Sequence, residues 1–455
     1  MNNKLSLLYR KDGTQKFLSS LIAILLGMVF GSVLIAIVGA TNPDIGGKGI
    51  LDGIKLVFLG LFSTGKTDAG TLTFGFNPAL FGDMLFRATP LIMTGLSVAV
   101  SQKTGLFNIG APGQYLMGTL ASLMIALSIP TTTVPPAVVW LLAFLGGCLA
   151  GALWGAIPGL LKAFLNINEV LACIMTNWIA ANLVTLLFDI SKFSIFTGAQ
   201  TSAMGDPIVL HGSFKNLIES TKSAYIYKTT YNNVATPKLG LDKLLPGSQV
   251  NGGILIAIAI AVLVYIIIHK TTFGYQLKAC GANRHAARYA GIQDKRNIVF
   301  SMAIAGCLAG AGAALYWLSG NTEFAWQTYQ SLPAVGFNGI PVALLAINNP
   351  IGVIFSGILM AMLNIIGARL TALTSYNEYI TDVIIAAIVY LSAFALMIRM
   401  WLSGSNKKKM LAFKPAAVNP EPPKPAETEK PVEAIKPPED PAPVVSENQE
   451  GGAQV

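Results

Sequence analysis

Long apolar runs separated by short polar segments make up most of this chain. Several runs keep about 20 nearly uncharged residues in a row, the length that a helix needs to cross a bilayer. The pattern predicts an all-α polytopic membrane protein with about ten transmembrane helices, in which residues 17–402 form the transmembrane domain. The predicted spans are approximately 17–40, 80–102, 113–129, 135–158, 168–190, 252–269, 297–318, 334–348, 350–371 and 380–401.

The composition agrees with a membrane protein. Charged residues make up only 12% of the 455 residues, whereas 53% are hydrophobic. Soluble domains carry about 25% charged residues, so this chain has too few to cover a water-facing surface. The net charge of +9 does not indicate nucleic-acid binding, since basic residues of membrane proteins collect in cytoplasmic loops. The cysteines, Cys148, Cys173, Cys280 and Cys307, show no spacing typical of disulfide frameworks or zinc sites.

The distribution of basic residues predicts which side of the membrane each segment faces. Basic residues gather in the N-terminal segment 1–16, in the segment 270–296 and at 407–409. Cytoplasmic loops are enriched in Lys and Arg, so we expect all three segments and both termini in the cytoplasm. Even numbers of predicted spans separate these segments, which fits this orientation. The loops 41–79 and 191–251 then face outside.

Residues 60–67, GLFSTGKT, fit the P-loop pattern at every position. A P-loop also needs a following helix inside a βαβ unit, and here the turn-rich stretch DAGTLTFGFNPALFG follows. The segment also lies in a predicted external loop, where no ATP pool exists. We therefore interpret it as a chance match, and we expect another subunit to bind any ATP that powers this protein.

The C-terminal segment, residues 403–455, differs from the rest of the chain. Its sequence KPAAVNPEPPKPAETEKPVEAIKPPEDPAPVV is rich in Pro, Glu, Lys and Ala and poor in aromatic residues. Such a segment cannot bury a hydrophobic core. We predict a disordered, Pro-rich cytoplasmic tail.

Small residues recur at four-residue spacing on two predicted spans. They are Gly147, Gly151, Gly155 and Gly159 on one span and Gly306, Gly310 and Ala314 on the other. This spacing lets helix backbones approach closely in lipid, which predicts tight packing within the bundle. An alternative interpretation is that such smooth faces slide during gating.

Uncharged amides stand out at the predicted membrane depth: Asn108, Gln114, Asn177, Asn182 and Asn364. Burying an amide costs free energy unless it has a hydrogen-bond partner or faces water. These residues either hold helices together or line a path for a neutral, hydrogen-bonding solute, and the sequence leaves both interpretations open. Carboxylates well inside the spans are scarce, which argues against a proton- or sodium-coupled carrier.

Two segments between spans have unusual patterns. TGLFNIGAPGQ, residues 104–114, contains too many Gly and Pro residues for a regular helix. It is either a short cytoplasmic turn or a broken-helix element beside a substrate path. In the basic segment 271–297, ANRHAARYA predicts a short helix with Asn283 as its N-cap. That helix either binds lipid headgroups or serves as a contact for a cytosolic motor.

Four segments together resemble the permease subunits of bacterial ABC importers of the ribose and nucleoside type, and most closely the nucleoside branch. They are RATPLIMTGLSVAVSQKTGLFNIGAPGQYLMGTL (87–120), NEVLACIMTNWIA (168–180), GYQLKACGANRHAARYAGI (274–292) and GFNGIPVALLAINNPIG (336–352). The resemblance runs through most of the membrane domain and does not cover the tail.

The resemblance implies a type II ABC importer-like permease in the bacterial cytoplasmic membrane. It implies four kinds of partner: a second permease, usually a related chain; a cytosolic ABC ATPase that binds ATP; an extracytoplasmic substrate-binding lipoprotein; and membrane lipid. It implies no cofactor, metal or catalytic residue in this chain. The implied contact with the ATPase, a coupling helix, comprises Gly274, Gly281, Ala282, Asn283, Arg284, Ala286, Ala287, Arg288, Ala290 and Gly291. The implied substrate pathway comprises Asn108, Gln114, Asn168, Glu169, Asn177 and Asn338.

Two positions depart from the family pattern. Pro112 stands where relatives commonly carry Glu, and Asn338 where they commonly carry Asp.

The hypothesis that the resemblance supports is an importer of a nucleoside, with a purine nucleoside favoured. The alternatives are ribose or another simple sugar carried by the same machinery, and, further away, an ion-coupled secondary transporter. If the coupling helix is assigned correctly, an Arg288→Glu substitution should leave membrane insertion intact and uncouple transport.

Overall fold

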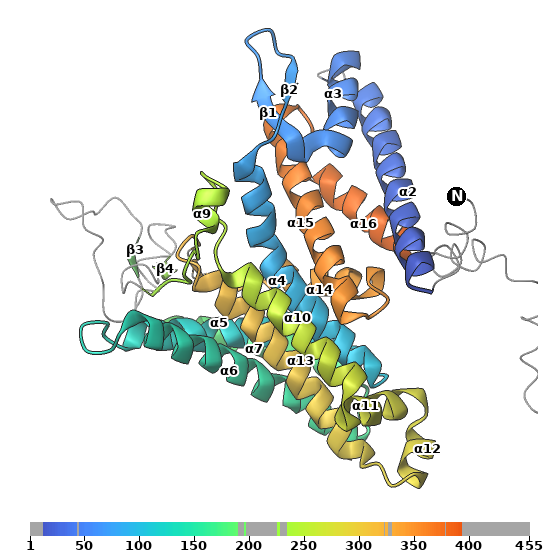
Figure 1. The fold of residues 1–455 in the computed structure, drawn as a ribbon, viewed down its shortest axis with the longest axis vertical. Helices are drawn as coiled ribbons and strands as arrows, with labels where there is room; N and C mark the ends of the chain where they lie inside the picture. Colours follow the sequence, from blue (N-terminus) through green and yellow to red (C-terminus); the bar gives the residue numbers. More distant parts are fainter. Residues whose placement is uncertain are drawn as a thin grey trace, which may run out of the picture. The chain divides into compact units, whose positions relative to one another are not determined.

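The computed structural model describes residues 12–42, 45–189, 195–196, 225–227, 234–322, 324–325, 330–377 and 379–393 (Figure 1). All of them belong to one compact unit, Met1–Gly404. Most of the predicted cytoplasmic N-terminus and the whole predicted tail, 403–455, lie outside the described residues, so these two predictions stay untested.

Helices dominate the described residues. The membrane-domain helices are α2 (Asp12–Thr41), α4 (Pro78–Lys103), α5 (Ala111–Ser128), α6 (Pro136–Leu165), α7 (Glu169–Asp189), α10 (Gly253–Lys270), α13 (Asp294–Trp317), α14 (Ala334–Leu345), α15 (Pro350–Leu373) and α16 (Tyr379–Ala393). The shorter helices are α3 (Gly46–Leu59), η1 (Gly60–Phe62), α9 (Leu241–Leu244), α11 (Thr272–Ala282) and α12 (Arg284–Tyr289).

Each predicted span coincides with one of these helices, which confirms the helical membrane class. Six of the described helices are long and apolar enough to cross a bilayer: α4, α6, α7, α10, α13 and α15. The count of about ten complete spans stays a prediction. Helix α14 has only 12 residues, a length of about 18 Å, and is too short to cross a hydrocarbon core of about 30 Å. Of the predicted span 334–348, the structure shows helix over Ala334–Leu345 alone, so a complete crossing there stays a prediction.

Local caps explain where several helices begin. The Asn77 side chain accepts a hydrogen bond from the Leu80 amide, and Pro78 follows it as the first residue of α4. Asn349 and Pro350 repeat this arrangement at the start of α15. An amide side chain satisfies a backbone N–H that lacks an intrahelical partner, and proline there loses no hydrogen bond.

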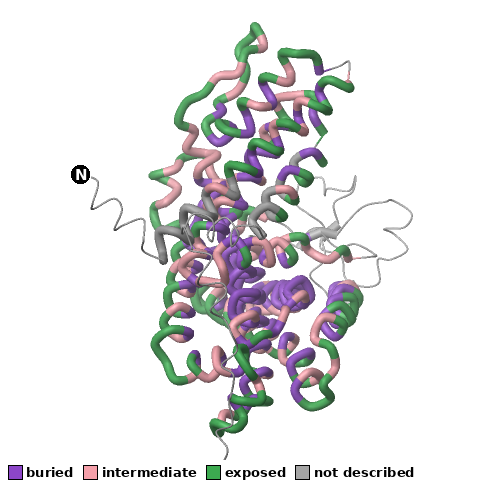
Figure 2. Tube along the Cα trace, turned by 90° about the vertical axis from the view of Figure 1, so that its right-hand side faces the viewer, coloured by how far each residue is buried: buried purple, intermediate pink, exposed green. Residues whose placement is uncertain are grey.

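Helices α4 and α13 form the centre of the membrane domain. Helix α4 is buried along almost its whole length and packs against α10, α13, α14 and α15. In contrast, α6 packs one face against α13 and exposes leucines such as Leu145, Leu149 and Leu153 on the other. Figure 2 shows the buried positions gathered in the interior and the exposed ones along the outer helices.

The glycine pattern on two spans is confirmed as a close helix contact. A Cβ atom added at Gly151 would collide with the carbonyl oxygen of Gly306, and one at Gly310 would collide with that of Gly147. The backbones of α6 and α13 therefore touch, which only glycine permits at this separation.

The predicted outer loops contain structure of their own. Region 41–79, which we expected as a loop, holds helix α3 and a hairpin of β1 (Ser63–Lys66) with β2 (Leu72–Phe74), paired antiparallel with Lys66 opposite Leu72. Within region 191–251, β3 (Ile195–Phe196) and β4 (Tyr225–Tyr227) join β5 (Phe324–Ala325) in a small antiparallel sheet.

Candidate functional site

Three predicted pathway residues come together around the irregular segment 104–110, which joins α4 to α5. They are Asn108 within the segment, Gln114 on α5 and Asn177 on α7. We call them the amide cluster. Asn108 and Gln114 hydrogen-bond to each other twice: the Asn108 Nδ2 donates to Gln114 Oε1 at 3.0 Å, and the Gln114 Nε2 donates to Asn108 Oδ1 at 3.2 Å. Asn108 also donates to the Ser97 hydroxyl and accepts from the Gly110 amide.

Asn177 on α7 fastens the same segment from the side. Its Oδ1 accepts from the Gly113 amide at 2.9 Å, and its Nδ2 donates to the Ile109 carbonyl at 3.0 Å. Asn108, Gln114 and Asn177 are 0%, 1% and 2% exposed. Segment 104–114 is therefore a broken-helix element as far as Gly110, after which α5 begins. The amide cluster satisfies its backbone and is closed to solvent within this chain.

Asn168 and Glu169 lie apart from the amide cluster, at the turn from α6 into α7. The Asn168 Oδ1 accepts from the Val170 amide at 2.9 Å, as at a helix N-terminus. Glu169 forms an ion pair with Lys162 at 3.0 Å, with both side chains partly exposed. The structure therefore places these two predicted pathway residues in helix-end interactions.

Asn338, the remaining predicted pathway residue, lines an open pocket of about 180 Å³. We call it the polar pocket. Its lining comprises Phe86, Arg87, Pro90 and Leu91 of α4, Gln249, Tyr316 of α13, Val335 and Asn338 of α14, and Asn364 of α15. Among the described residues, the side chains of Asn338 and Asn364 have no hydrogen-bond partner, and both are partly exposed.

The polar pocket offers two kinds of contact. Arg87 donates hydrogen bonds, and the two asparagines both donate and accept. The rings of Phe86 and Tyr316 stack at 5.4 Å between centroids and form an apolar wall. Such a site suits a flat or ring-shaped solute with several hydrogen-bonding groups. Sequence reasoning singled out both asparagines and missed Phe86, Tyr316 and Gln249, for which no local pattern gives a signal.

The basic segment 271–297 forms the helices α11 and α12, which we call the helix pair. Asn283 caps α12 as predicted, because its side chain accepts from the Ala286 amide at 3.0 Å. The implied coupling helix, which begins at Gly274, is two helices in the structure: α11 ends at Ala282, and α12 begins at Arg284. Close packing requires the glycine at 274, because a Cβ at Gly274 would collide with the end of α10.

Arg284 and Arg288 both bind Asp294 at the start of α13. The Arg284 Nε lies 2.6 Å from Asp294 Oδ2, and the Arg288 Nη2 lies 2.8 Å from the same oxygen. The hydrogen bond to Asp294 also raises the pKa of Arg288. These arginines anchor α12 to the membrane domain. An Arg288→Glu substitution would break this anchor, so that variant cannot test an external contact by itself.

The most exposed large hydrophobic side chain of α12 is Tyr289, at 95%. A tyrosine ring at this position is free to contact another protein, and tyrosine is among the residues enriched at the energetic centres of interfaces. Sequence reasoning, which relied on glycines and arginines in this segment, did not identify Tyr289.

Two close backbone contacts connect the helix pair to the polar pocket. A Cβ at Gly281 would collide with the Lys103 carbonyl oxygen, and one at Gly105 would lie 3.3 Å from the Gly281 Cα. Further along the segment, a Cβ at Gly336 of α14 would lie 2.5 Å from the Pro112 Cα. The irregular segment thus touches α11 at Gly105, and the first turn of α5, which follows that segment directly, touches the helix that carries Asn338.

The segment GLFSTGKT does not have the geometry of a P-loop. Gly60–Phe62 form a turn of 3₁₀-helix, and Ser63–Lys66 are strand β1 of the outer hairpin. Thr67 is followed by a turn and then β2. A P-loop binds phosphate with the N-terminus of the helix that follows its lysine, and a strand takes that place here.

These features describe a helical membrane protein with a polar pocket between its helices and a pair of short helices at its surface. Over residues 80–393 the chain matches the family described as branched-chain amino acid transport system, permease component. The chain belongs to this family of membrane permeases, whose members are transporter subunits rather than enzymes.

Relatives over most of the chain are ABC transporter permeases. The nucleoside ABC transporter permease protein NupB of Lactococcus lactis is 33% identical over 88% of this chain and 95% of its own length. The guanosine ABC transporter permease protein NupP of Bacillus subtilis is 31% identical over 86% and 96%. The glucose ABC transporter permease protein TsgB13 of Haloferax volcanii is 29% identical over 68% and 74%.

The same two bacteria each supply a second, more distant relative. NupC of L. lactis and NupQ of B. subtilis carry the same descriptions and are 24% and 25% identical to this chain. No solved structure matches the chain.

Proposed function

We propose that this chain is a permease subunit of an ATP-driven ABC importer that moves a nucleoside, and a purine nucleoside in particular, across the bacterial cytoplasmic membrane. The observation that carries this proposal is its similarity to NupB and NupP, which are named for nucleoside and guanosine and are covered almost to their full length. The polar pocket supports it, because stacked rings beside neutral amides suit a base or a ribose.

The proposal includes three protein partners. NupB and NupC, like NupP and NupQ, are pairs of related permeases in one organism, which supports a second, non-identical permease for this chain. A separate cytosolic ATPase binds and hydrolyses ATP, and the GLFSTGKT match is a coincidence of sequence. A binding lipoprotein delivers the solute from outside.

The proposed orientation places the helix pair and both termini in the cytoplasm. The support is the excess of Lys and Arg in the segment 270–296, which is typical of cytoplasmic loops. The hairpin of β1 and β2 then lies outside, where it is available to the lipoprotein.

In the proposed mechanism, the ATPase contacts the helix pair through Tyr289. Movement of α11 is passed to the irregular segment at the contact of Gly281 with Gly105, and the amide cluster keeps that segment rigid. The contact of Pro112 with Gly336 then shifts α14 and with it Asn338 in the polar pocket. Packed contacts of this kind transmit displacement because they cannot be compressed.

The first experiment is uptake of radiolabelled guanosine by intact cells with and without this chain. Ribose, glucose, uridine and adenosine serve as unlabelled competitors. We expect deletion to abolish uptake, and nucleosides but not sugars to compete. Competition by ribose or glucose alone would instead favour a sugar as the transported solute. The similarity to TsgB13, which is named for glucose, is the reason to include these two competitors.

Energy coupling is tested in the same cells. We expect uptake to survive an ionophore that collapses ion gradients while ATP is maintained, and to stop when ATP is depleted. The opposite result would identify an ion-coupled secondary transporter.

A further inference from the structure

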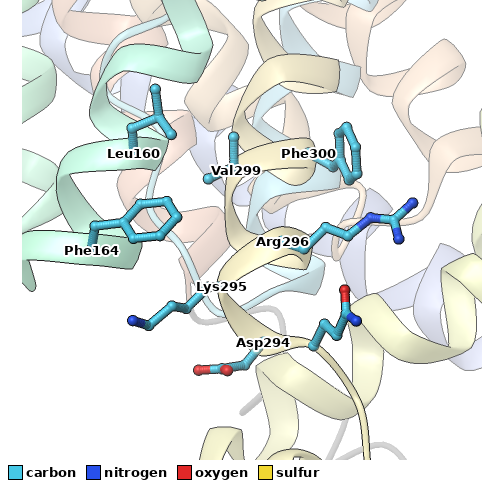
Figure 3. Close-up of a pocket in the computed structure, with 8 residues that line it drawn as sticks. Leu160, Phe164, Asp294, Lys295, Arg296, Val299 and Phe300 are labelled. Carbon is cyan, nitrogen blue, oxygen red and sulfur yellow. The ribbon is translucent and has the colours of Figure 1, made fainter.

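A pocket at the junction of α6 and α13 has no role in the mechanism above. We call it the boundary pocket; it encloses about 520 Å³ (Figure 3). Its lining comprises Leu160 and Phe164 of α6, Gln293, and Asp294, Lys295, Arg296, Val299 and Phe300 of α13.

The boundary pocket combines apolar surface with two cations. Lys295 extends toward Phe164, with its Nζ 5.2 Å from the ring centroid, and the Arg296 guanidinium lies 5.2 Å from the Phe300 ring (Figure 3). Leu160, Phe164 and Phe300 are all more than 40% exposed. A lipid-facing groove lined by such side chains fits an acyl chain.

The two cations lack acidic partners within the described part of the chain. Asp294, the nearest carboxylate in sequence, is only 5% exposed and already binds Arg284 and Arg288. The two positive charges therefore lie at opposite ends of the pocket, Lys295 beside Phe164 and Arg296 beside Phe300, and neither has a compensating anion among the described residues (Figure 3). Cations without an acidic partner can form charge-assisted hydrogen bonds with an anionic ligand.

The sequence places these cations at the depth of the headgroups. QDKR, residues 293–296, is followed at once by the apolar run of α13, and the basic loop before it is the proposed cytoplasmic one. The cytoplasmic leaflet carries the anionic phospholipids that attract such basic residues.

We propose that the boundary pocket binds an anionic phospholipid of the cytoplasmic leaflet. Lys295 pairs with the headgroup phosphate at the Phe164 end of the pocket, Arg296 donates to the headgroup from the Phe300 end, and Leu160, Phe164 and Phe300 contact an acyl chain. The bound lipid lies beside Asp294, the residue that anchors the helix pair. This proposal rests on the membrane orientation and not on the solute carried, so an unexpected solute leaves it intact.

The test is native mass spectrometry of the full chain purified in detergent and titrated with phosphatidylglycerol or phosphatidylcholine. We expect phosphatidylglycerol to bind at least about tenfold more tightly than phosphatidylcholine. The double variant Lys295→Gln/Arg296→Gln should bind it about thirtyfold more weakly, since each cation near a membrane surface contributes about a factor of five. Equal binding of the two lipids by the unchanged chain would overturn the proposal.

A matched control separates a site from general surface charge. The double variant Lys270→Gln/Lys278→Gln removes the same charge outside the pocket and should keep the preference for phosphatidylglycerol. An equal loss in both double variants would show a diffuse electrostatic effect and contradict a site. The exchange Lys295→Arg/Arg296→Lys should preserve binding, which guards against misfolding as the cause of a loss.

A further comparison distinguishes a lipid from a free phosphate. Leu160→Ala should weaken phosphatidylglycerol binding, whereas Leu153→Ala, which changes an exposed leucine of α6 outside the pocket, should not. Displacement of the lipid by millimolar inorganic phosphate, with no effect of Leu160→Ala, would identify a phosphate site and overturn the lipid proposal.

Discussion

The amide cluster and the polar pocket both contain amide side chains within the helical domain, yet these amides have opposite surroundings. In the amide cluster, Asn108, Gln114 and Asn177 are closed to solvent and hydrogen-bonded to one another or to backbone. In the polar pocket, Asn338 and Asn364 are partly exposed, and no described residue satisfies them. The difference teaches that an amide at membrane depth is structural when its partners lie within the chain, and available to a solute when they do not.

The substitution with the largest expected effect is Asn177→Leu in the amide cluster. It leaves the Gly113 amide and the Ile109 carbonyl without partners in a buried setting. We expect the free energy of unfolding to fall by about 3 kcal/mol or more. Thermal unfolding of the purified chain measures this loss.

Asn182→Leu on the same helix is the matched control. Asn182 is exposed and bonds only to the Trp178 carbonyl one turn away, so its loss should change stability by less than about 0.5 kcal/mol. If Asn177→Leu were as stable as this control but inactive in uptake, the amide cluster would belong to the solute path after all.

The helix pair repeats the same contrast between a satisfied group and an available one. Arg288 forms an ion pair with Asp294 of the same chain, whereas the Tyr289 side chain is almost fully exposed. We expect Tyr289→Ala to reduce uptake about thirtyfold without loss of stability, because exposed aromatic anchors contribute about 2 kcal/mol to protein contacts.

Tyr275→Ala is the matched control for Tyr289→Ala, because it removes an exposed tyrosine from α11 instead of α12. Co-purification with the ATPase reports the contact directly. Equal losses of ATPase binding in the two variants would argue that the whole helix pair, and not the Tyr289 ring, forms the contact.

A smaller effect is expected in the polar pocket. Asn364→Leu removes hydrogen bonds that are made only to the solute, so KM for uptake should rise about tenfold. Because no described partner is left unsatisfied, thermal unfolding should be unchanged. A large drop in stability with unchanged KM would place Asn364 among the structural amides.

The smallest expected effect is that of Asn338→Asp, which introduces the residue that the family resemblance led us to expect at this position. The pocket is open to water and contains Arg87, so a carboxylate there is well solvated and partly compensated. We expect guanosine uptake at neutral pH to change by less than about threefold. A loss beyond about tenfold would show that this transporter depends on an uncharged group at this position.

The sequence by itself determined the class and the positions of the helices. A run of about 20 apolar residues is stable in a bilayer as a helix whatever surrounds it, and caps such as Asn283 act within one turn. The short helix α12 and the irregular backbone after Lys103 could be predicted because their causes are local, and the glycine spacing on α6 and α13 predicted close packing without saying which helices meet. The segments that resemble transport permeases are likewise visible in the sequence alone.

Only the tertiary structure decided which helices are central and which amides are free. Helix α4 is buried within the protein, whereas α6 exposes leucines on one face. Because lipid tails are as apolar as leucine side chains, both helices have apolar sequences, and the sequence does not show which of them is buried by protein. Asn177 hydrogen-bonds to Ile109, and Asn338 and Tyr316 line the same pocket, although the residues of each pair are not close in sequence. Whether a polar group is satisfied depends on such partners, and the local pattern around the group does not contain them.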